Sequence, residues 1–215
     1  MTSNALPILY SFRRCPYAMR ARMALVAAGI AVELREVVLK DKPACMLAAS
    51  PKGTVPVLIA PSGEVIDESR DIMLWALREH DPQHWLALAD RPAMMALIDT
   101  CDDEFKTHLD HYKYFDRYPD HPQQHYREQA EVFLAQCEAH LASQAYLMGA
   151  SLGFADAAIF PFIRQFANVD MAWFEASPYS RLQRWLGECL GSALFAVAMH
   201  KYKPWQTGDL PVLLR

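Results

Sequence analysis

The sequence predicts two parts of different fold class: an α/β domain over residues 1–80 and an all-helical bundle over residues 92–215, joined by a linker at 81–91. Short apolar runs alternate with helical periodicity in the first third of the chain. A polar stretch then runs from residue 79 to Pro92. After Pro92, apolar residues follow helical spacing almost throughout. We therefore expect a βαβαββα domain with a mixed four-stranded sheet, followed by helices.

The composition is that of a globular chain. Its 215 residues are 53% hydrophobic, and the formal net charge of −4 gives no global reason to expect nucleic acid or an anionic membrane as a partner. No apolar run approaches the roughly 20 residues of a membrane span. The start of the chain lacks the basic and apolar regions of a signal peptide. Five scattered cysteines indicate a reducing, cytoplasmic location and no disulfide framework.

The first elements follow from local patterns. Residues 6–12 form a buried apolar run, residues 16–28 have helical periodicity and end at Gly29, and residues 31–39 alternate in part. A strand, helix and strand of this length form a βαβ unit with parallel strands.

The next elements are separated by turn residues. A short helix is expected over residues 44–49, and two short runs at 54–60 and 64–66 form an antiparallel hairpin. Asp67, Glu68 and Ser69 then cap a helix over residues 70–79.

Cys15 lies at the predicted junction of the first strand and the first helix, where Pro16 suits the first helical position. A sulfur at a helix N-terminus faces the first backbone N–H groups and the positive end of the helix dipole. Both favour the thiolate, which is the nucleophilic form, and Arg13 and Arg14 add positive charge. A buried or inert cysteine is the alternative interpretation, but this context predicts a reactive thiol.

Pro56 begins the run that follows Val55. Because proline cannot donate to a β-ladder, it belongs at a strand's first residue or in a special turn. A cis bond here would present the backbone N–H and C=O of Val55 to a ligand, although cis is uncommon even before proline.

The first 80 residues together resemble the thioredoxin-like domain of cytosolic glutathione transferases. The resemblance rests on the order of elements and on four motifs: Cys-Pro-Tyr-Ala at 15–18, Lys-Asp-Lys-Pro at 40–43, Thr-Val-Pro-Val at 54–57 and Glu-Ser at 68–69. The first two are most similar to the omega-class, glutaredoxin-like, cysteine-type enzymes. The resemblance implies a cis bond before Pro56, a helical C-terminal domain and a cytoplasmic homodimer.

The resemblance also implies a glutathione site formed by Cys15, Lys42, Val55, Glu68 and Ser69, to which Tyr17 is added as a candidate hydroxyl donor. Glutathione carries two carboxylates, an ammonium and a thiol. Glu68 can pair with the ammonium, and Ser69 can bind the γ-glutamyl carboxylate at a helix N-terminus. Val55 can pair as a strand does, and Lys42 can balance the glycyl carboxylate. Each residue also has a structural interpretation, as a helix cap, a packed aromatic, a solvated turn charge or a strand entry.

Ala18 stands where dithiol relatives carry a second cysteine. With no resolving thiol nearby in the sequence, the expected intermediate is a mixed disulfide between Cys15 and glutathione, resolved by a second glutathione. The expected function is a glutathione-dependent thiol transferase or reductase, with glutathione as cosubstrate and no tightly bound cofactor. The alternatives are conjugation of glutathione to small electrophiles, or a non-catalytic binding or regulatory protein of the same fold.

The helical part is expected to contain helices at 93–114, 123–141, 157–166, 179–191 and 192–199, then an extended tail from residue 203. Gly153 replaces the Ser or Thr of the usual capping box that ends at Asp156, at a cost of only a few tenths of a kcal/mol.

A small hydrophobic or thiol-containing second substrate is expected between the two domains. Its candidate walls are His108, Tyr112, Tyr202 and Trp205. Histidine, cysteine and acidic residues crowd the segment 101–125, but they lack the paired-ligand spacing of a zinc site. A polar helix is therefore the preferred interpretation of that segment, and no metal is expected.

Overall fold

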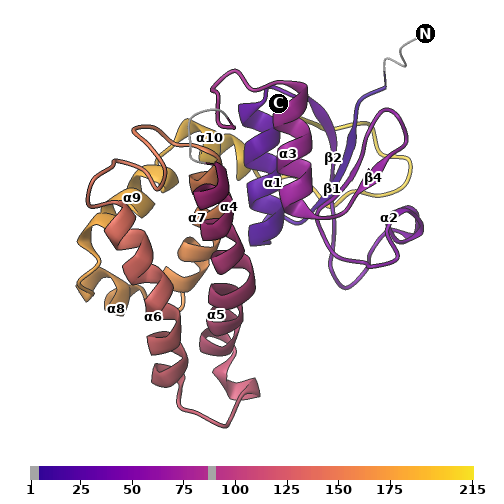
Figure 1. The fold of residues 1–215 in the computed structure, drawn as a ribbon. Helices are drawn as coiled ribbons and strands as arrows, with labels where there is room; N and C mark the ends of the chain where they lie inside the picture. The colour runs from indigo at the N-terminus through magenta and orange to yellow at the C-terminus, as the bar shows by residue number, and fades with distance from the viewer. Residues whose placement is uncertain (1–4, 87–90) are drawn as a thin grey trace. The chain divides into compact units, whose positions relative to one another are not determined.

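The computed structural model describes residues 5–86 and 91–215, and the chain forms two compact units (Figure 1). The sheet unit comprises Met1–Gln83 and Ser192–Arg215, and the helical unit comprises His84–Gly191. The sequence expectation assigned everything after residue 92 to the helical domain. The structure differs, because the chain from Ser192 onward belongs with the sheet unit. The predicted linker falls partly on residues 87–90, which lie outside the described residues.

The sheet unit contains a mixed sheet with the strand order β4-β3-β1-β2-β5. Its strands are β1 (Ile8–Ser11), β2 (Val32–Glu36), β3 (Val57–Ile59), β4 (Val65–Ile66) and β5 (Leu213–Leu214). Strand β1 is parallel to β2 and antiparallel to β3, which pairs in turn with β4. The predicted βαβ unit and hairpin are therefore confirmed. The expected extended tail instead ends in β5, which adds an antiparallel fifth strand to β2.

Four helices belong to the sheet unit: α1 (Pro16–Ala27), α2 (Ala44–Ala49), α3 (Ser69–Glu79) and α10 (Ala193–Ala198). Helix α1 packs against both α3 and α10, and Figure 1 shows α2 apart from these, beyond the strands. In α2, Met46 packs with Tyr10 and Val57, which are cross-strand partners. Because α1 is covered on several sides, ten of its twelve residues are buried, including two arginines.

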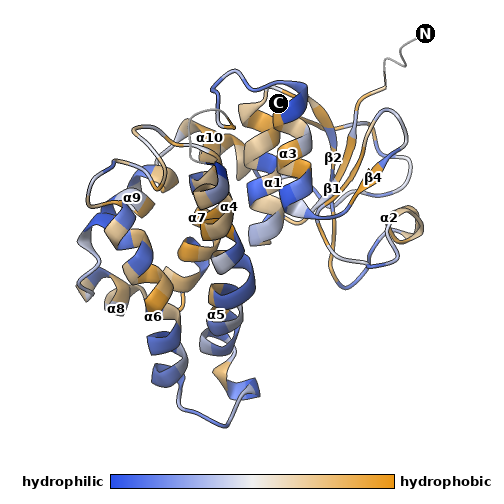
Figure 2. Cartoon of the chain, in the orientation of Figure 1, coloured by the Kyte–Doolittle hydropathy of each residue, from blue (hydrophilic) through white to orange (hydrophobic). Residues whose placement is uncertain are grey.

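The helical unit contains α4 (Arg91–Thr100), η1 (Cys101–Phe105), α5 (Lys106–Lys113), η2 (Phe115–Arg117), α6 (Gln123–His140), α7 (Phe154–Ala167), α8 (Met171–Ala176) and α9 (Ser180–Leu190). The helix expected over 93–114 is one continuous rod with a π-helical turn, η1, in its middle. The short helix α8 was not predicted. Figure 2 shows that α7 is largely hydrophobic where it is visible, whereas α5 is mostly hydrophilic.

The N-terminus of α7 is held by Asp156 rather than by a cap side chain. Its carboxylate accepts hydrogen bonds from the backbone N–H groups of Gly153 and Leu147, both at 2.9 Å, and from Trp185 Nε1 at 2.7 Å. Gly153 has no side chain to contribute, so the reciprocal half of a capping box is missing. Burial raises the pKa of Asp156 to about 6, although the donors oppose this rise.

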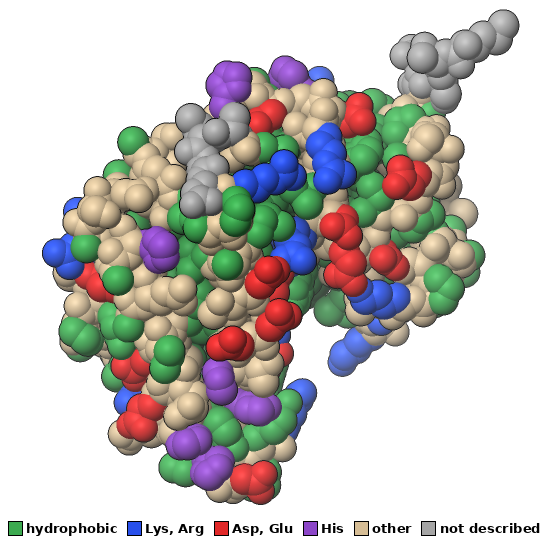
Figure 3. Space-filling model, viewed as in Figure 1, with side chains coloured by type: hydrophobic (Ala, Val, Ile, Leu, Met, Phe, Trp, Pro, Cys, Tyr) green, Lys and Arg blue, Asp and Glu red, His purple; other side chains and the backbone are tan. Residues whose placement is uncertain are grey.

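The surface is charged in a mixed way. Figure 3 shows Lys and Arg side chains interspersed with Asp and Glu over the visible face, in keeping with the mild net charge of −4. Within the described ranges, no helix is both long enough and apolar enough to cross a bilayer.

Candidate functional site

Cys15 is the N-cap residue of α1. Its backbone is extended (φ −73°, ψ 123°), Pro16 occupies the first helical position, and Met19 N–H donates to the Cys15 carbonyl at 2.9 Å. The side chain is half-buried, and its Sγ lies 3.6 Å from the carbonyl oxygen of Val55, to which the thiol donates. The sulfur therefore lies at the open end of a helix, where the first-turn N–H groups and the dipole favour negative charge.

The Val55–Pro56 peptide bond that follows this carbonyl is cis. The resemblance implied this conformation. Val55 is 9% exposed and packs in the cluster formed around Tyr10 and Met46. Its carbonyl therefore points from a well-packed segment toward the sulfur of Cys15.

A pocket of about 270 Å³ lies in the same unit. It is lined by Tyr17, Lys52, Thr54, Val55, Pro56, Asp67, Glu68 and Ser69. Four of the six residues expected to bind glutathione thus share one pocket, and the fifth, Cys15, contacts the pocket residue Val55. The sixth, Lys42, is half-buried in the neighbouring turn, with its Nζ about 4 Å from the position that a Cβ on Gly53 would take.

One end of this pocket is the N-terminus of α3. Ser69 is only 2% exposed, and its Oγ accepts a hydrogen bond from Arg20 Nε at 3.0 Å. Arg20 is itself 3% exposed, and its guanidinium carbon lies 5.2 Å from the centre of the Tyr17 ring. A helix N-terminus with a guanidinium behind its first serine is suited to an anionic group.

The other charges at this end come from Glu68 and Lys52. Glu68 is the N-cap residue of α3, and its carboxylate pairs with the ammonium of Lys52. Both side chains are well exposed, so this ion pair contributes little to stability. Behind them, Ser50 Oγ donates to Asp67 Oδ2 at 2.6 Å and fixes the turn that precedes α3.

Two backbone N–H groups fix the turn before Cys15 by hydrogen bonds. Arg13 N–H donates to Glu36 Oε1 at 2.7 Å, and Cys15 N–H donates to the carbonyl of Phe12 at 3.0 Å. Arg14 is exposed, with its guanidinium carbon 5.5 Å from the centre of the Phe12 ring. Partial burial raises the pKa of Glu36 even though Arg13 N–H and the nearby charge of Arg22 act in the opposite direction.

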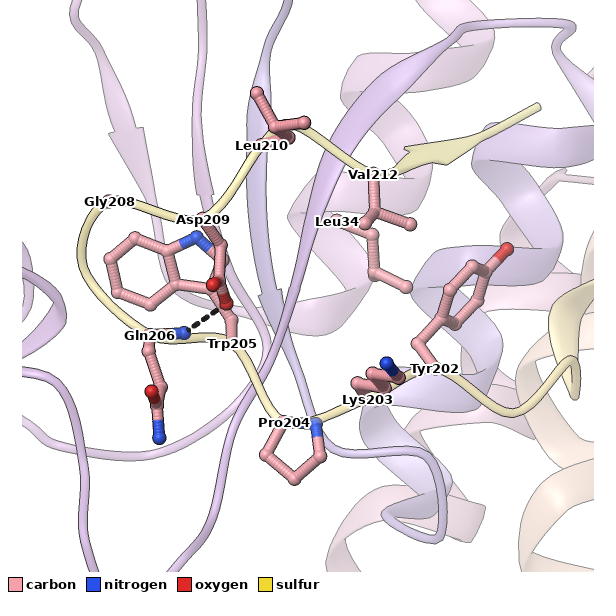
Figure 4. Close-up of a pocket in the computed structure, with 10 residues that line it drawn as sticks. All are labelled: Leu34, Tyr202, Lys203, Pro204, Trp205, Gln206, Gly208, Asp209, Leu210 and Val212. Carbon is pink, nitrogen blue, oxygen red and sulfur yellow. Dashed lines mark hydrogen bonds between the residues drawn. The ribbon is translucent and has the colours of Figure 1, made fainter.

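The four residues proposed to contact a second substrate lie in two different units. Tyr202 and Trp205 belong to the sheet unit and line a cavity of about 730 Å³ formed by the C-terminal segment and Leu34 (Figure 4). Trp205 packs edge-on to Tyr10, and the Arg35 guanidinium lies 4.4 Å from its ring centre.

The other two of these residues belong to the helical unit. Tyr112 is 2% exposed and packs on Phe166, with ring centres 5.1 Å apart. His108 is half-buried, and burial together with the charge of His111 lowers the pKa of its imidazole. That these four residues form one substrate-binding wall stays a prediction.

Histidines gather at one end of the helical unit, as Figure 3 shows. His121 and His125 stack with ring centres 4.1 Å apart, and His111 lies 4.0 Å from the Tyr118 ring centre. In the described part of the chain, no three His, Cys, Asp or Glu side chains are arranged so that they could hold a metal ion.

Three basic residues at or near the site were not predicted as functional: Lys52, Arg20 and Arg22. Lys52 lies in a segment that reads as a simple turn. Arg20 and Arg22 lie in α1, whose helical periodicity is carried by its apolar residues. The available signal was that α1 is flanked by two strands, because a helix covered on several sides has no solvated face for an arginine.

A thioredoxin-like sheet unit with a cysteine at its first helix, followed by a helical unit, is the architecture of the cytosolic glutathione transferases. Two models of this family match the sequence. The glutathione S-transferase N-terminal domain matches residues 9–84, and the glutathione S-transferase C-terminal domain matches residues 83–188. The chain belongs to the glutathione S-transferase family.

Curated relatives include omega-class proteins. Glutathione S-transferase omega-1 of Rattus norvegicus is 44% identical over 61 residues, which cover 28% of this chain and 25% of the relative. A probable glutathione transferase of Aplysia californica is 42% identical over 55 residues, covering 26% of this chain and 60% of the relative. The aligned region spans only about a quarter of the length of the omega-class relatives.

Solved structures show the same fold over nearly the whole chain. A glutathione transferase family member from Pseudomonas fluorescens, with two glutathione molecules bound, has a TM-score of 0.78 at 18% identity and covers 90% of this chain and 92% of its own. Glutathione transferase Omega 3C from Trametes versicolor has a TM-score of 0.77 at 20% identity, with 94% and 92% covered. At these identities the likeness establishes the fold alone.

Proposed function

We propose that this protein is a glutathione-dependent thiol transferase or reductase that acts through a mixed disulfide between Cys15 and glutathione. The observation that carries the proposal is the position of the Cys15 sulfur at the N-cap of α1, 3.6 Å from the Val55 carbonyl. The pocket lined by Val55, Glu68 and Ser69 lies next to it. The family membership and the omega-class relatives support glutathione as the cosubstrate.

The pocket chemistry fits the tripeptide group by group. The γ-glutamyl carboxylate would bind Ser69 at the N-terminus of α3, and the ammonium would pair with Glu68. The cysteinyl N–H would donate to the Val55 carbonyl, which otherwise accepts the Cys15 thiol proton. Binding would thus free the Cys15 sulfur of that hydrogen bond as the ligand sulfur arrives. Tyr17 would contact the ligand, and Lys42 would balance the glycyl carboxylate from the edge of the pocket.

The reaction consists of two exchange steps. The Cys15 thiolate attacks the glutathione sulfur of a mixed disulfide, which forms a Cys15–glutathione disulfide and releases the acceptor as a thiolate that takes up a proton. A second glutathione, as its thiolate, then attacks the glutathione sulfur of the enzyme-bound disulfide. This step releases glutathione disulfide and regenerates the Cys15 thiolate. In total, one acceptor disulfide is reduced, and two glutathione units leave as their disulfide.

The proposal also covers the acceptor, the oligomeric state, the location and the cofactor requirement. The acceptor is a small hydrophobic or thiol-containing molecule, the protein is a cytoplasmic homodimer, and no tightly bound cofactor takes part. Cys15 forms no disulfide in the structure, and the exchange starts from its thiol.

Incubation with glutathione disulfide followed by peptide mass spectrometry tests the proposal. We expect one added glutathionyl group on Cys15, and no such adduct in Cys15→Ser. Cys45→Ser is the matched control, because Cys45 is an exposed thiol of the same unit. An adduct on Cys45 alone, or on no cysteine, would refute the mechanism.

Two further outcomes identify the alternatives. Conjugation to an aryl halide that survives Cys15→Ser would identify a conjugating enzyme. The absence of glutathione binding by calorimetry would identify a non-catalytic protein of this fold.

A further inference from the structure

Arg22 of α1 is a buried cation that hydrogen-bonds two other segments of the sheet unit, residues 11–13 and the end of α10. Only 1% of it is exposed. Its Nη1 donates to Ser11 Oγ at 2.5 Å and its Nη2 to the Arg13 carbonyl at 2.8 Å, while Nε donates to the Ala198 carbonyl at 2.7 Å. Ser11 ends β1, Arg13 belongs to the turn before Cys15, and Ala198 ends α10. The guanidinium is therefore fixed between the segment that precedes Cys15 and the C-terminal end of α10.

The acceptors around Arg22 are neutral groups: one hydroxyl, two backbone carbonyls and, at 3.7 Å, the thioether sulfur of Met199. Burying a cation without a carboxylate in contact costs free energy, and an apolar side chain of similar length would avoid that cost. Burial accordingly lowers the pKa of Arg22 to about 10, which still leaves it protonated at neutral pH. Its charge therefore calls for an explanation other than stability alone.

The charge of Arg22 lies close to the turn that precedes Cys15 and therefore affects the ionisation of the Cys15 thiol. The charged groups that interact with Arg22 are, in decreasing order, Glu36, Cys15, Arg13 and Tyr202, and the anionic form of Cys15 favours the protonated guanidinium as Glu36 does. The interaction is reciprocal, so the guanidinium favours the anionic form of the sulfur. The hydrogen bond to the Arg13 carbonyl also fixes the backbone two residues before Cys15. The charge of Arg22 and its hydrogen bond to the Arg13 carbonyl thus both affect the Cys15 side chain.

We propose that Arg22 is a positioning residue for the Cys15 thiol: from beneath the turn it fixes residues 11–13 and favours the thiolate. This inference rests on the proposed role of Cys15 in thiol exchange. It adds to that role a buried source of positive charge separate from the helix end and from the exposed Arg14.

Arg20 offers a matched control. It is also a buried arginine of α1, two residues earlier, and its Nε donates to Ser69 Oγ at the N-terminus of α3. Residues two apart on a helix point to different sides, so the two guanidiniums serve opposite ends of the site. Cys45 provides an internal reference thiol within every sample, because it is exposed.

The experiment measures alkylation of Cys15 and Cys45 by iodoacetamide from pH 5 to 9 in the full chain, resolved by peptide mass spectrometry. In Arg22→Met, we expect the midpoint of the Cys15 profile to rise by about one pH unit. The Cys45 midpoint stays in place. In Arg20→Met, the Cys15 midpoint stays at the wild-type value, while glutathione binding weakens. In Arg22→Lys, the charge remains but the planar fork is lost, so we expect an unchanged midpoint and about tenfold slower disulfide exchange.

A folded Arg22→Met protein with the wild-type Cys15 midpoint would overturn the inference. If Arg22→Met does not fold, Arg22→Lys decides, and a wild-type exchange rate in that variant would overturn it. A separate readout shows whether the proposed function itself fails. In that case, wild-type Cys15 forms no adduct with glutathione disulfide, whether or not its alkylation midpoint depends on Arg22.

Discussion

Ser69 and Arg20 form a pair of buried polar residues at the N-terminus of α3. Because Ser69 Oγ accepts a hydrogen bond from Arg20, its own O–H is directed to another acceptor. In the proposed complex that acceptor is the γ-glutamyl carboxylate. Hydrogen bonds to charged groups contribute about 1.5–3 kcal/mol, so Ser69→Ala should weaken glutathione binding at least tenfold by calorimetry. Ser62→Ala, in an exposed turn, is the control, and equal affinity of the two variants would argue against the assignment.

Lys52 competes for the carboxylate that is proposed to bind the ligand ammonium. The Lys52–Glu68 pair is exposed, and such pairs contribute about 0–1 kcal/mol. Glutathione should therefore displace Lys52 at little cost, and Lys52→Met should change the affinity by less than about fivefold. Glu68→Gln removes the charge that binds the ammonium and should cost about tenfold or more. Titration calorimetry of the two variants checks this order, and a larger loss in Lys52→Met would show that Lys52 binds the ligand directly.

At the scale of single elements, Asp156 determines how α7 responds to pH. Its folded pKa of about 6 lies above the unfolded value of about 3.9, so the folded state binds the proton more tightly. This contribution to stability is present below about pH 4 and is lost as the pH rises through about 6. In Asp156→Asn this titration is absent, and a buried N–H loses its acceptor at a cost of about 1–3 kcal/mol.

Urea unfolding between pH 4 and 7 measures this effect. The wild-type free energy of unfolding minus that of Asp156→Asn should be positive and should decrease with rising pH. A difference that stays constant or increases would contradict the role assigned to Asp156.

The short strand β5 anchors the end of the chain to β2. Leu214, which pairs with Val32, is fully buried, whereas its neighbour Leu213 is 39% exposed. Leu214→Ala should therefore cost about 2–5 kcal/mol of unfolding free energy, as other buried Leu→Ala changes do. Leu213→Ala, a change of the same chemistry one residue away, should cost less than about 1 kcal/mol. Equal costs in urea unfolding would mean that β5 is not part of the folded sheet.

At the scale of the whole molecule, local sequence signals predicted most of the sheet unit. The turn and cap residues around Cys15, Gly29 and Ser69 lie at the ends of elements, so the βαβ unit and the hairpin follow from neighbouring residues alone. The pairing of β5 with β2 joins residues 180 and 182 positions apart and is only two residues long. No periodicity exists in two residues, and the association of Ser192–Arg215 with the sheet unit was therefore missed.

The candidate site likewise contains residues that local motifs predict and residues whose contacts only the fold reveals. Cys15, Val55, Glu68 and Ser69 stand in short motifs, and the structure brings them to one region of the sheet unit. Arg22 contacts the end of β1 and the carbonyl of Ala198, 176 residues further along the chain. A sequence shows that an arginine is present, but not which distant carbonyl it meets. Buried polar contacts of this kind require the fold.

The most direct measurement of the central claim is the steady-state rate of reduction of a glutathione mixed disulfide by wild-type protein, Cys15→Ser and Cys45→Ser. Serine keeps the size of the side chain but is a far weaker nucleophile, so Cys15→Ser should lose at least about a hundredfold in kcat/KM. Cys45→Ser should retain the wild-type value. A Cys15→Ser protein that reduces the disulfide at the wild-type rate would contradict the account.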